Sequence, residues 1–221
     1  MIENNSMRLK RCFDVALSIA ILLLASPICM VAAIAVWLES GRPILFRQTR
    51  VGKDFVCFEI LKFRTMRAGS DGPSVTTRGD ARITGVGRLL RAAKIDEFPQ
   101  FWNVLRGDMS IVGPRPEIPE YVEIFKARYQ NILTIRPGIT DLASICFRNE
   151  EVVLADNQDP LDAYKSLVLP AKLDLADQYV HAHSALRDME IILLTAIVTL
   201  WPSAAGPARI VFKRTAPRAR N

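Results

Sequence analysis

The sequence predicts an α/β protein, mainly helical with a small sheet, whose N-terminal region associates with a membrane. An apolar run without a charged residue extends from Val15 to Leu38, and the remaining chain combines helical periodicity with a clear strand pattern. We expect an N-terminal segment with a membrane helix over 1–40, a folded domain over 41–202 and a basic tail over 203–221.

The apolar run is long enough to cross a bilayer, because a straight helix over 15–38 would measure about 36 Å. A cleaved signal peptide would be shorter, and a buried helix of a soluble protein is rarely apolar on every face. A plain transmembrane anchor is the simplest interpretation from hydropathy alone.

A proline and the flanking charges favour a different membrane topology. Pro27 removes a backbone donor and displaces the carbonyl of Leu23, and Ser26 can bond back to a preceding carbonyl, which bends a helix. Basic residues mark the cytoplasmic side, and they stand on both flanks of the run: Arg8, Lys10, Arg11, Arg42, Arg47, Arg50 and Lys53. The sequence therefore predicts a re-entrant helix-break-helix, with Ser26 and Pro27 at the break, in a monotopic membrane protein.

The chain after the membrane run begins with one strand, predicted over Phe55 to Arg64 from its apolar and aromatic residues. Residues 68–80 are rich in Gly, Ser and Thr and predict a mobile loop, which we expect either to connect or to close over a ligand. A short helix is expected over 87–94. A second is expected over 95–105, with Asp96 at its N-cap and Pro99 in its first turn. Its apolar face fits either core packing or an amphipathic helix in the lipid interface.

The C-terminal half is predicted to contain three further helical segments. The first covers 119–129, between a turn-rich connector over 107–119 and a tight turn over 136–140. The second covers 163–184 with an interruption near Pro170. The third covers 186–201; its apolar stretch from Ile191 is too short to span a bilayer, so it packs on the core or lies in the membrane surface.

Charge and cysteine usage narrow the functional classes. The net charge is +6, and most of it comes from the tail, a composition typical of a solvated segment or of binding to anionic lipid headgroups. Nucleic acid is disfavoured as a partner, because no aromatic residues alternate with the basic ones in the folded part. The four cysteines are scattered and predict a reducing compartment, and the two histidines, His181 and His183, do not form a zinc motif.

The adjacent acids Asp96 and Glu97 are the leading candidates for chemistry. Acids near a helix start are common, because the helix dipole favours them there. Their surroundings favour catalysis, since cationic residues cluster in the flanking segments: Lys62, Arg64, Arg88, Arg91 and Arg115. Consecutive helical residues diverge by about 100°, so one acid is expected to face a reacting phosphorus while the other orients it or holds a metal ion. A carboxylate can attack phosphorus when cations neutralise the phosphate charge.

Two prolines enclose an arginine in the segment Pro114–Arg115–Pro116. Prolines on both sides fix the backbone, so the guanidinium is held ready to bind phosphate or to stack on a base. A rigid surface turn with a solvated arginine is the other interpretation of this motif.

Together these motifs resemble the bacterial sugar transferase family, the monotopic polyprenyl-phosphate phosphoglycosyl transferases, in its minimal form. The resemblance runs from about Arg8 to Trp201. It rests on four motifs in order: KFRTM at 62–66, IDEFPQFWNVLRGDMS at 95–110, VGPRP at 112–116 and RPGIT at 136–140. The segment after Thr140 departs from many relatives, so the transferred sugar stays open.

The resemblance implies a mechanism for the cytosolic domain on the inner leaflet. It assigns Asp96 as the nucleophile of a covalent phosphosugar intermediate and Glu97 as its assistant, both with Mg²⁺. It places Lys62 and Arg64 beside the phosphates, and the cluster of cations upstream of the acids adds Arg88 and Arg91 as substrate-binding candidates. The segment Pro114–Arg115–Pro116 would contact the nucleotide.

The expected substrates are a UDP-sugar and undecaprenyl phosphate, which would give a polyprenyl diphosphosugar and UMP at the cytoplasmic face of a bacterial inner membrane. Membrane lipids are expected partners, and a homodimer is a candidate assembly. A non-catalytic scaffold that binds partners or anionic lipids is the alternative, and a membrane-anchored nucleic-acid-binding protein ranks third.

Overall fold

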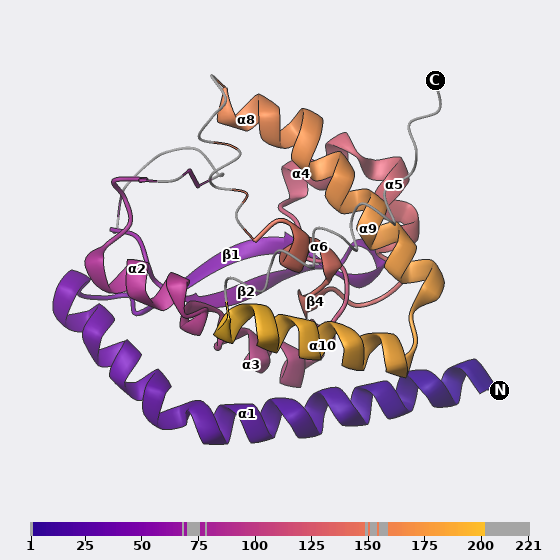
Figure 1. The fold of residues 1–221 in the computed structure, drawn as a ribbon, viewed down its shortest axis with the longest axis horizontal. Helices are drawn as coiled ribbons and strands as arrows, with labels where there is room; N and C mark the ends of the chain where they lie inside the picture. Colours follow the sequence, from indigo (N-terminus) through magenta and orange to yellow (C-terminus); the bar gives the residue numbers. More distant parts are fainter. Residues whose placement is uncertain are drawn as a thin grey trace.

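The fold was analysed in a computed structural model that describes residues 2–67, 69, 76–77, 79–148, 150, 154 and 159–201. Helices pack around two small two-stranded sheets (Figure 1). The predicted class, mainly helical α/β with a small sheet, is confirmed. The predicted tail over 203–221 and most of the predicted 68–80 loop lie outside the described residues.

The N-terminal helix α1 (Ile2–Ser40) is continuous and contains Pro27. Figure 1 shows that it bends along its course. The hydroxyl of Ser26 donates to the carbonyl of Leu23 at 2.8 Å, the back-bond expected beside a proline that displaces this carbonyl. The helix continues through the predicted break at Ser26–Pro27, and the serine satisfies a carbonyl that proline leaves without its usual donor.

The two faces of α1 have opposite character. A stripe at helical spacing faces the protein and is small or polar, with Asp14, Ser18, Ala25, Ala32 and Val36 buried. The outward face carries large apolar residues: Ile19, Leu23, Leu24, Ile28, Met30, Val31, Ile34, Trp37 and Leu38. The segment Met7–Ser40 has a window of mean hydropathy 2.7, and among the described helices it is the one long and apolar enough to cross a membrane. Such a helix fits membrane association.

A β-hairpin follows α1. Strands β1 (Leu45–Val51) and β2 (Cys57–Phe63) are antiparallel, with Leu45 opposite Phe63 and Val51 opposite Cys57. A short 3-10 turn (Lys53–Phe55) joins them. The predicted strand over 55–64 is confirmed as β2, and its partner β1 was not predicted.

Two helices flank the tight turn that carries the candidate acids. Helix α2 (Gly85–Ala92) confirms the helix expected over 87–94. Asp96 is not an N-cap as predicted, because it lies inside the separate 3-10 turn η2 (Ile95–Glu97), and α3 (Gln100–Arg106) begins after Pro99. On α3, Phe101 is buried, whereas Trp102 is 54% exposed. The apolar face of α3 is therefore partly buried in the core and partly exposed on the surface.

A parallel pair of short strands joins two segments that were predicted as turns. Strand β3 (Ser110–Val112) pairs with β4 (Gly138–Thr140), and α4 (Pro119–Ile124) and α5 (Lys126–Ile132) connect them. A Cβ atom on Gly138 would lie 2.1 Å from the backbone nitrogen of Gly113. The two backbones cross so closely that only glycine fits there.

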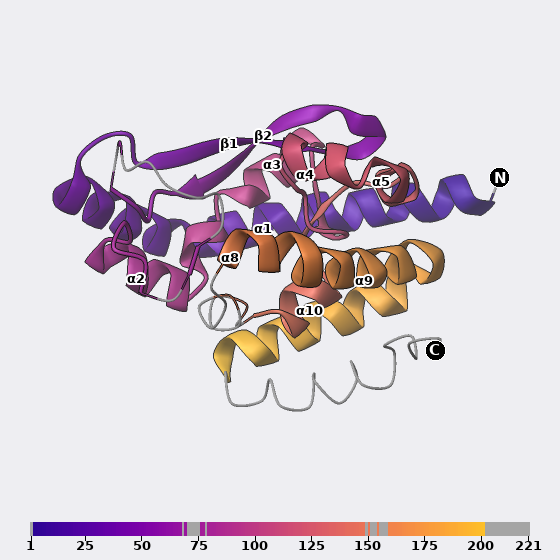
Figure 2. The same cartoon turned by 90° about the horizontal axis from the view of Figure 1, so that it is seen from above.

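The remaining described helices follow β4 in the sequence, and the last of them, α10 (Ala185–Leu200), packs against β3 and β4. After α6 (Leu142–Cys146), helix α8 (Pro160–Ala163) continues through a π-helical stretch (Tyr164–Val168) into α9 (Leu169–Ala182). The interruption predicted near Pro170 is this stretch. Helix α10 buries Ile191 and Val198 and exposes Leu193 and Leu200. The prediction that this segment packs on the core is confirmed for one face, and contact of the other face with the membrane surface stays a prediction. Figure 2 shows α10 beside α9.

Helix α1 is part of the core rather than an appendage. Leu17, Ile21 and Leu22 pack against a buried cluster that includes Val104, Met109 and Ile191. Further along, α1 contributes two buried residues to another cluster, which consists of Ala32, Val36, Phe63 and Leu90. The membrane-associated helix and the folded domain are therefore one packed unit.

Candidate active site

Asp96 and Glu97 lie in η2, the tight turn between α2 and α3. Lys94 precedes them with a left-handed backbone at φ 58°, so the chain changes direction sharply after α2. The turn directs both acids inward: Asp96 is 7% exposed, and the side chain of Glu97 is 14% exposed. Adjacent buried acids need cations or a ligand nearby, because burying an uncompensated charge is costly.

Two cations from different elements compensate Glu97. Its Oε1 accepts a hydrogen bond of 3.0 Å from the guanidinium of Arg115, and the ammonium of Lys62 lies 3.6 Å away. Burial opposes the ionisation of Glu97, but Arg115 and Lys62 outweigh it and hold the pKa well below its usual range. Glu97 is therefore a carboxylate at neutral pH, and its charge is already neutralised by protein groups.

Asp96 is in a different state. Its Oδ1 is buried and has no hydrogen-bond partner among the described residues. Burial raises the pKa of Asp96, the charge of Glu97 raises it further, and Lys62, Lys94 and Arg91 act in the opposite direction. The Asp96 carboxylate thus has a free oxygen and a destabilised negative charge, the properties of a nucleophile or of a ligand for a cation.

Lys62 connects the hairpin to this turn. It stands on β2 next to Phe63, and successive residues of a strand point to opposite faces. Phe63 joins the apolar cluster with Val36 and Leu90, whereas Lys62 reaches Glu97. Burial lowers the pKa of Lys62 to about 8, although Glu97 favours the charged form.

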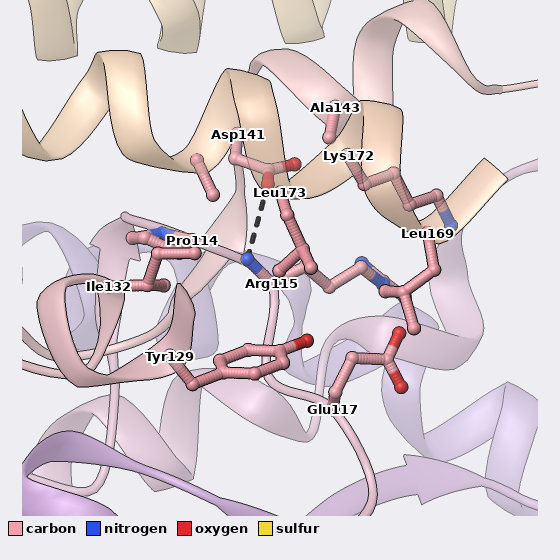
Figure 3. A pocket seen from close by; sticks show the side chains of 11 residues that line it. Pro114, Arg115, Glu117, Tyr129, Ile132, Asp141, Ala143, Leu169, Lys172 and Leu173 are labelled. Atoms are coloured by element: carbon pink, nitrogen blue, oxygen red, sulfur yellow. Dashed lines mark hydrogen bonds between the residues drawn. The ribbon is translucent and has the colours of Figure 1, made fainter. Parts of the chain in front are cut away.

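Arg115 is held in place through its own backbone. Its N–H donates to Oδ2 of Asp141 at 3.1 Å, and Oδ1 of Asp141 accepts from the N–H of Ser144 at 2.7 Å (Figure 3). Pro114 and Pro116 on either side are buried. The negative charge of Glu97 raises the pKa of Arg115 above its usual value. The rigid segment that the sequence predicted therefore carries its guanidinium to the acid pair, and the solvated-arginine interpretation is wrong.

A buried network under the same loop escaped the sequence analysis. Arg50 donates to the carbonyl of Pro116 at 3.2 Å and to Glu117 at 3.1 Å. The hydroxyl of Tyr164 donates to the other oxygen of Glu117 at 2.6 Å. A small pocket lies beside it, and Arg115, Glu117 and Asp141 line it together with Tyr129 and Lys172 (Figure 3). The sequence could have identified Asp141 as a structural residue, because an Asp directly before a helix is a favoured N-cap. It contains no comparable indication for Arg50 and Glu117.

Of the other predicted cations, Arg91 acts on the charge of Asp96 from α2, whereas Arg64 and Arg88 lie elsewhere. Arg64 is 6% exposed and donates to the end of α1, at 2.6 Å to the carbonyl of Ser40 and 2.8 Å to that of Gly41. The Nε atom of Arg91 donates to the hydroxyl of Thr65 at 2.9 Å. Arg88 is exposed on α2. The structure thus brings together Asp96, Glu97, Lys62 and Arg115, and it places Arg64 against the end of α1.

The acid pair fits a divalent cation that keeps most of its own water. Within the described ranges, no group of three or more His, Cys, Asp or Glu side chains forms a metal cage. Mg²⁺ prefers oxygen ligands and commonly binds through one or two carboxylates together with substrate phosphates. The free, buried Oδ1 of Asp96 is such a ligand, and Glu97 adjoins it.

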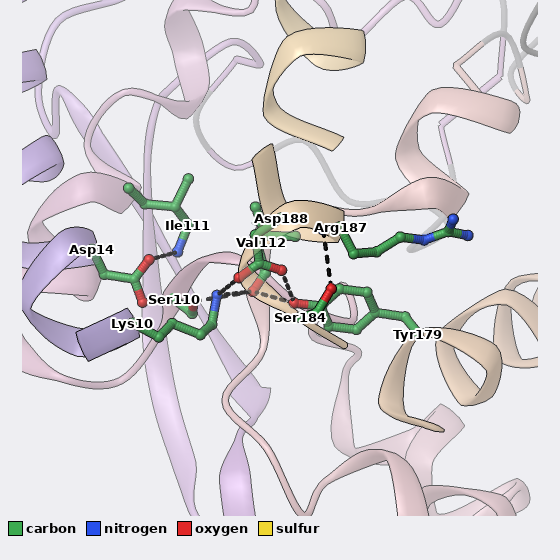
Figure 4. A network of polar contacts seen from close by, with 9 residues as sticks. All are labelled: Lys10, Asp14, Ser110, Ile111, Val112, Tyr179, Ser184, Arg187 and Asp188. Carbon is green, nitrogen blue, oxygen red and sulfur yellow. Dashed lines mark hydrogen bonds and ion pairs between the residues drawn. The ribbon is translucent and has the colours of Figure 1, made fainter. Parts of the chain in front are cut away.

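A second polar cluster joins α1 to β3 and α10, away from the acid pair. Lys10 pairs with Asp188 at 2.5 Å, and the hydroxyl of Tyr179 donates to the same carboxylate at 2.6 Å (Figure 4). Asp14 accepts from the hydroxyl of Ser110 at 2.7 Å and from the N–H of Ile111 at 3.3 Å. Every partner is a protein group, so we interpret this cluster as a structural attachment of α1.

Comparison with known proteins finds relatives with names that refer to the transfer of a sugar or a sugar phosphate. A UDP-glucose:undecaprenyl-phosphate glucose-1-phosphate transferase of Caulobacter vibrioides is 42% identical over 191 residues, covering 84% of this chain and 67% of that protein. A protein of the same name from Escherichia coli K12 is 38% identical, covering 85% of this chain but 39% of its own length. A Bacillus subtilis protein named as an uncharacterized sugar transferase is 34% identical, with 86% of both chains covered.

The sequence profile of one protein family, described as bacterial sugar transferase, matches residues 5–202. The match includes α1, the acid pair and the loop of Arg115. The chain belongs to the bacterial sugar transferase family.

Proposed function

We propose that this chain is a phosphoglycosyl transferase that moves a sugar 1-phosphate from a UDP-sugar to undecaprenyl phosphate, releasing UMP. One observation carries the proposal: Asp96 has a free buried carboxylate oxygen beside Glu97, whose own charge Lys62 and Arg115 neutralise. The names of the relatives in Caulobacter and Escherichia support the two substrate classes. The product is a polyprenyl diphosphosugar, a first membrane-bound intermediate of glycoconjugate synthesis.

In the first step, the Asp96 carboxylate attacks the phosphorus that carries the sugar. A bond forms between this phosphorus and the Asp96 oxygen, the bond to the UMP phosphate breaks, and its electron pair leaves with UMP. The destabilised charge of the buried Asp96 favours the attack, because the ion has little solvent to lose. The enzyme then holds the sugar phosphate as an acyl phosphate.

In the second step, an oxygen of the lipid phosphate attacks the same phosphorus. The acyl phosphate bond breaks, and Asp96 regains its carboxylate. Each step begins with an anion approaching an anion, so the site must supply positive charge. Lys62 and Arg115 supply it from β2 and from the 114–116 loop, and Glu97 orients both groups.

Asp96 and Glu97 would hold Mg²⁺ through the free Oδ1 of Asp96. When bound, the ion would neutralise charge on the phosphate oxygens of the donor. Arg115 is suited to bind the diphosphate or to stack on the base, because its guanidinium is planar and its backbone is fixed by Asp141. Arg64 stays a predicted phosphate ligand, although its observed contacts are with α1.

We also propose that α1 enters and leaves the cytoplasmic leaflet of the bacterial inner membrane without crossing it. The bend of α1 in Figure 1, the proline inside the helix and the basic residues on both flanks support this topology. The exposed apolar faces of α1 and α10 suit contact with lipid. Assembly as a homodimer stays a prediction.

The test is UMP release by detergent-purified protein from a panel of UDP-sugars that begins with UDP-glucose, with Mg²⁺ and undecaprenyl phosphate. Wild type is compared with Asp96→Asn, which keeps the shape of the side chain and removes the nucleophile. Glu123→Gln, an exposed acid on α4, is the matched control. Turnover with one sugar that only Asp96→Asn abolishes would support the proposal.

A non-catalytic scaffold predicts a different outcome for the same panel. A folded protein that releases no UMP from any UDP-sugar, yet binds vesicles of anionic lipid, would favour the scaffold. Nucleic-acid binding would instead depend steeply on salt and survive the loss of Asp96.

A further inference from the structure

The last turn of α1 makes an unusual contact with the start of α2. The carboxylate of Glu39 accepts the backbone N–H of Gly85 at 2.8 Å and that of Val86 at 3.0 Å. The next N–H, that of Gly87, donates to the side chain of Thr84 at 2.9 Å. The first three N–H groups of α2, which have no partner inside the helix, are therefore satisfied, two of them by a residue of the membrane-associated helix.

Helix α2 depends on such support more than most helices do. It spans Gly85–Ala92, has two glycines in its first turn and has no acidic residue there. Glycine disfavours a helix by about 1 kcal/mol relative to alanine, but the chain cannot replace Gly87. A Cβ atom at that position would lie 2.1 Å from the carbonyl oxygen of Thr65. The close packing of α2 on Thr65 therefore weakens the helix start, and the Glu39 carboxylate compensates.

The other end of α2 leads directly to the candidate nucleophile. The N–H of Ala93 donates to Leu89 at 3.1 Å, and that of Lys94 to Arg91 at 3.1 Å. The N–H of Glu97 then bonds to Lys94 at 3.4 Å. A continuous path of backbone hydrogen bonds runs from the start of α2 into the turn of Asp96, so a displacement of the helix start shifts this turn.

The position of Glu39 is fixed in turn by the strand that carries Lys62. Arg64, one residue beyond β2, donates to the carbonyls of Ser40 and Gly41 at the end of α1. A cation at a helix C-terminus is favourable, because it complements the helix dipole. Glu39 and Arg64 thus connect the end of α1 to both elements that precede the acid pair.

We propose that Glu39 is a positioning residue, which holds the start of α2 against the end of the membrane helix and thereby places Asp96 for attack. The inference rests on the proposed function. Lys62 and Arg115, which would bind the donor, stand on β2 and on the 114–116 loop rather than on α2. Loss of Glu39 therefore displaces the turn of Asp96 and Glu97, whereas the backbones that carry Lys62 and Arg115 are held separately, by the pairing of β2 with β1 and by Asp141.

The experiment compares Glu39→Ala with wild type in single-turnover and steady-state UMP release. Misplacing a catalytic group by about 1 Å costs up to 100-fold in rate, so we expect kcat to fall by about tenfold or more. The KM for the UDP-sugar should stay within about twofold of the wild-type value, because the donor contacts are intact. Glu123→Ala, an exposed acid on α4, should change neither constant.

A second variant separates positioning from general destabilisation. Proline is favoured at the first helical position and needs no acceptor for an N–H, and Thr84 before it already has the extended backbone that proline requires, with φ −75° and ψ 166°. Gly85→Pro added to Glu39→Ala should therefore restore most of the lost kcat. An unchanged kcat in Glu39→Ala, or a raised KM with no recovery by Gly85→Pro, would overturn the inference.

Hydrogen exchange keeps this test independent of the proposed reaction. In Glu39→Ala the amides at 85–87 should lose protection, whereas those of α10 should not. If wild type releases no UMP, the proposed function fails, and the exchange pattern still shows whether Glu39 holds α2. Unchanged protection at 85–87 would refute the contact itself.

Discussion

The guanidinium of Arg115 and the carboxylate of Glu97 lie 3.0 Å apart, although the loop of Arg115 and the turn of Glu97 are separate elements. Through this contact the 114–116 loop, which the sequence predicts to bind the nucleotide, lies next to Asp96 and Glu97. A guanidinium has five N–H donors, so Arg115 can hold Glu97 and still have N–H groups for a phosphate.

Arg115→Lys should therefore be severely impaired although its charge is kept. Without the guanidinium, Glu97 loses its strongest partner, and the donor would lose the diphosphate or base contact proposed for Arg115. We expect kcat/KM for the UDP-sugar to fall by about 100-fold, as for loss of one group that stabilises transition-state charge. Steady-state UMP release measures the effect. Arg47→Lys, on an exposed arginine of β1, should behave as wild type, and equal losses in both variants would contradict the prediction.

Lys62 should give the reaction an alkaline limit. Burial lowers the pKa of Lys62 to about 8, so the ammonium loses its proton as the pH rises through this value. We expect kcat/KM to fall by about tenfold per pH unit above it. Lys62→Arg should move the limit to higher pH, because arginine stays charged. A pH profile that is the same in both proteins would show that another group sets the limit.

Asp96→Asn should abolish UMP release and stabilise the protein at neutral pH. Burial and the charge of Glu97 raise the pKa of Asp96 in the folded state. The native state then binds more protons than the unfolded state above the unfolded pKa, so ionisation of Asp96 lowers the free energy of unfolding as the pH rises. The Asp96→Asn variant has no carboxyl group at this position, so its free energy of unfolding does not fall for this reason as the pH rises. Thermal unfolding in detergent without Mg²⁺ should show a higher Tm for Asp96→Asn at pH 7 and a smaller difference at pH 4.

Asp14→Ala tests whether α1 belongs to the folded unit. The substitution leaves the hydroxyl of Ser110 and the N–H of Ile111 without their acceptor. A buried unsatisfied donor costs about 1–3 kcal/mol, and Tm falls by about 2–4 °C per kcal/mol in a chain of this size. Glu190→Ala, on the exposed side of α10, is the control. An unchanged Tm in Asp14→Ala would mean that α1 is only an anchor.

The native cysteines test the re-entrant topology. Cys12 precedes the apolar run and Cys57 lies on β2, and both are exposed. In variants that keep only one of them, an impermeant maleimide should label both from the cytoplasmic side, in inverted vesicles, and neither in spheroplasts. A spanning helix would instead expose Cys12 in spheroplasts.

The sequence predicted those parts of the fold whose signal is local. The apolar run, β2 and the helices over 87–94 and 186–201 follow from periodicity, and Pro27 and Pro170 marked the bend and the interrupted helix. Strand β1 escaped because its polar and apolar residues do not alternate cleanly. The β3–β4 pair escaped because each strand is three residues long and is defined by a partner distant in the sequence.

The residues of the candidate site also fall into two groups, those that the sequence predicted and those that it did not. The adjacent acids and the cations clustered near them in the sequence identified Asp96, Glu97, Lys62 and Arg115, the resemblance gave them roles, and the structure brings these four together. The resemblance did not place Arg64 against α1, because a motif conveys which residues occur together and not which way each one points. The supporting residues Glu39 and Arg50 act through backbone groups of other elements, and such contacts leave no pattern in a single sequence. Asp141 had a local signal as an N-cap, but its contact with the backbone of Arg115 had none.

The outward face of α1 is apolar, and the residues buried most fully on its inward face are small or polar; in the proposed membrane topology the lipid bilayer becomes a structural component of the enzyme. Detergent or bilayer thickness would act on the outward face of α1. The last turn of α1 contacts α2 through Glu39 and the end of β2 through Arg64, and these two elements precede the acid pair. The catalytic rate should therefore respond to the lipid environment even with a saturating donor, and nanodiscs of defined thickness become a way to tune it.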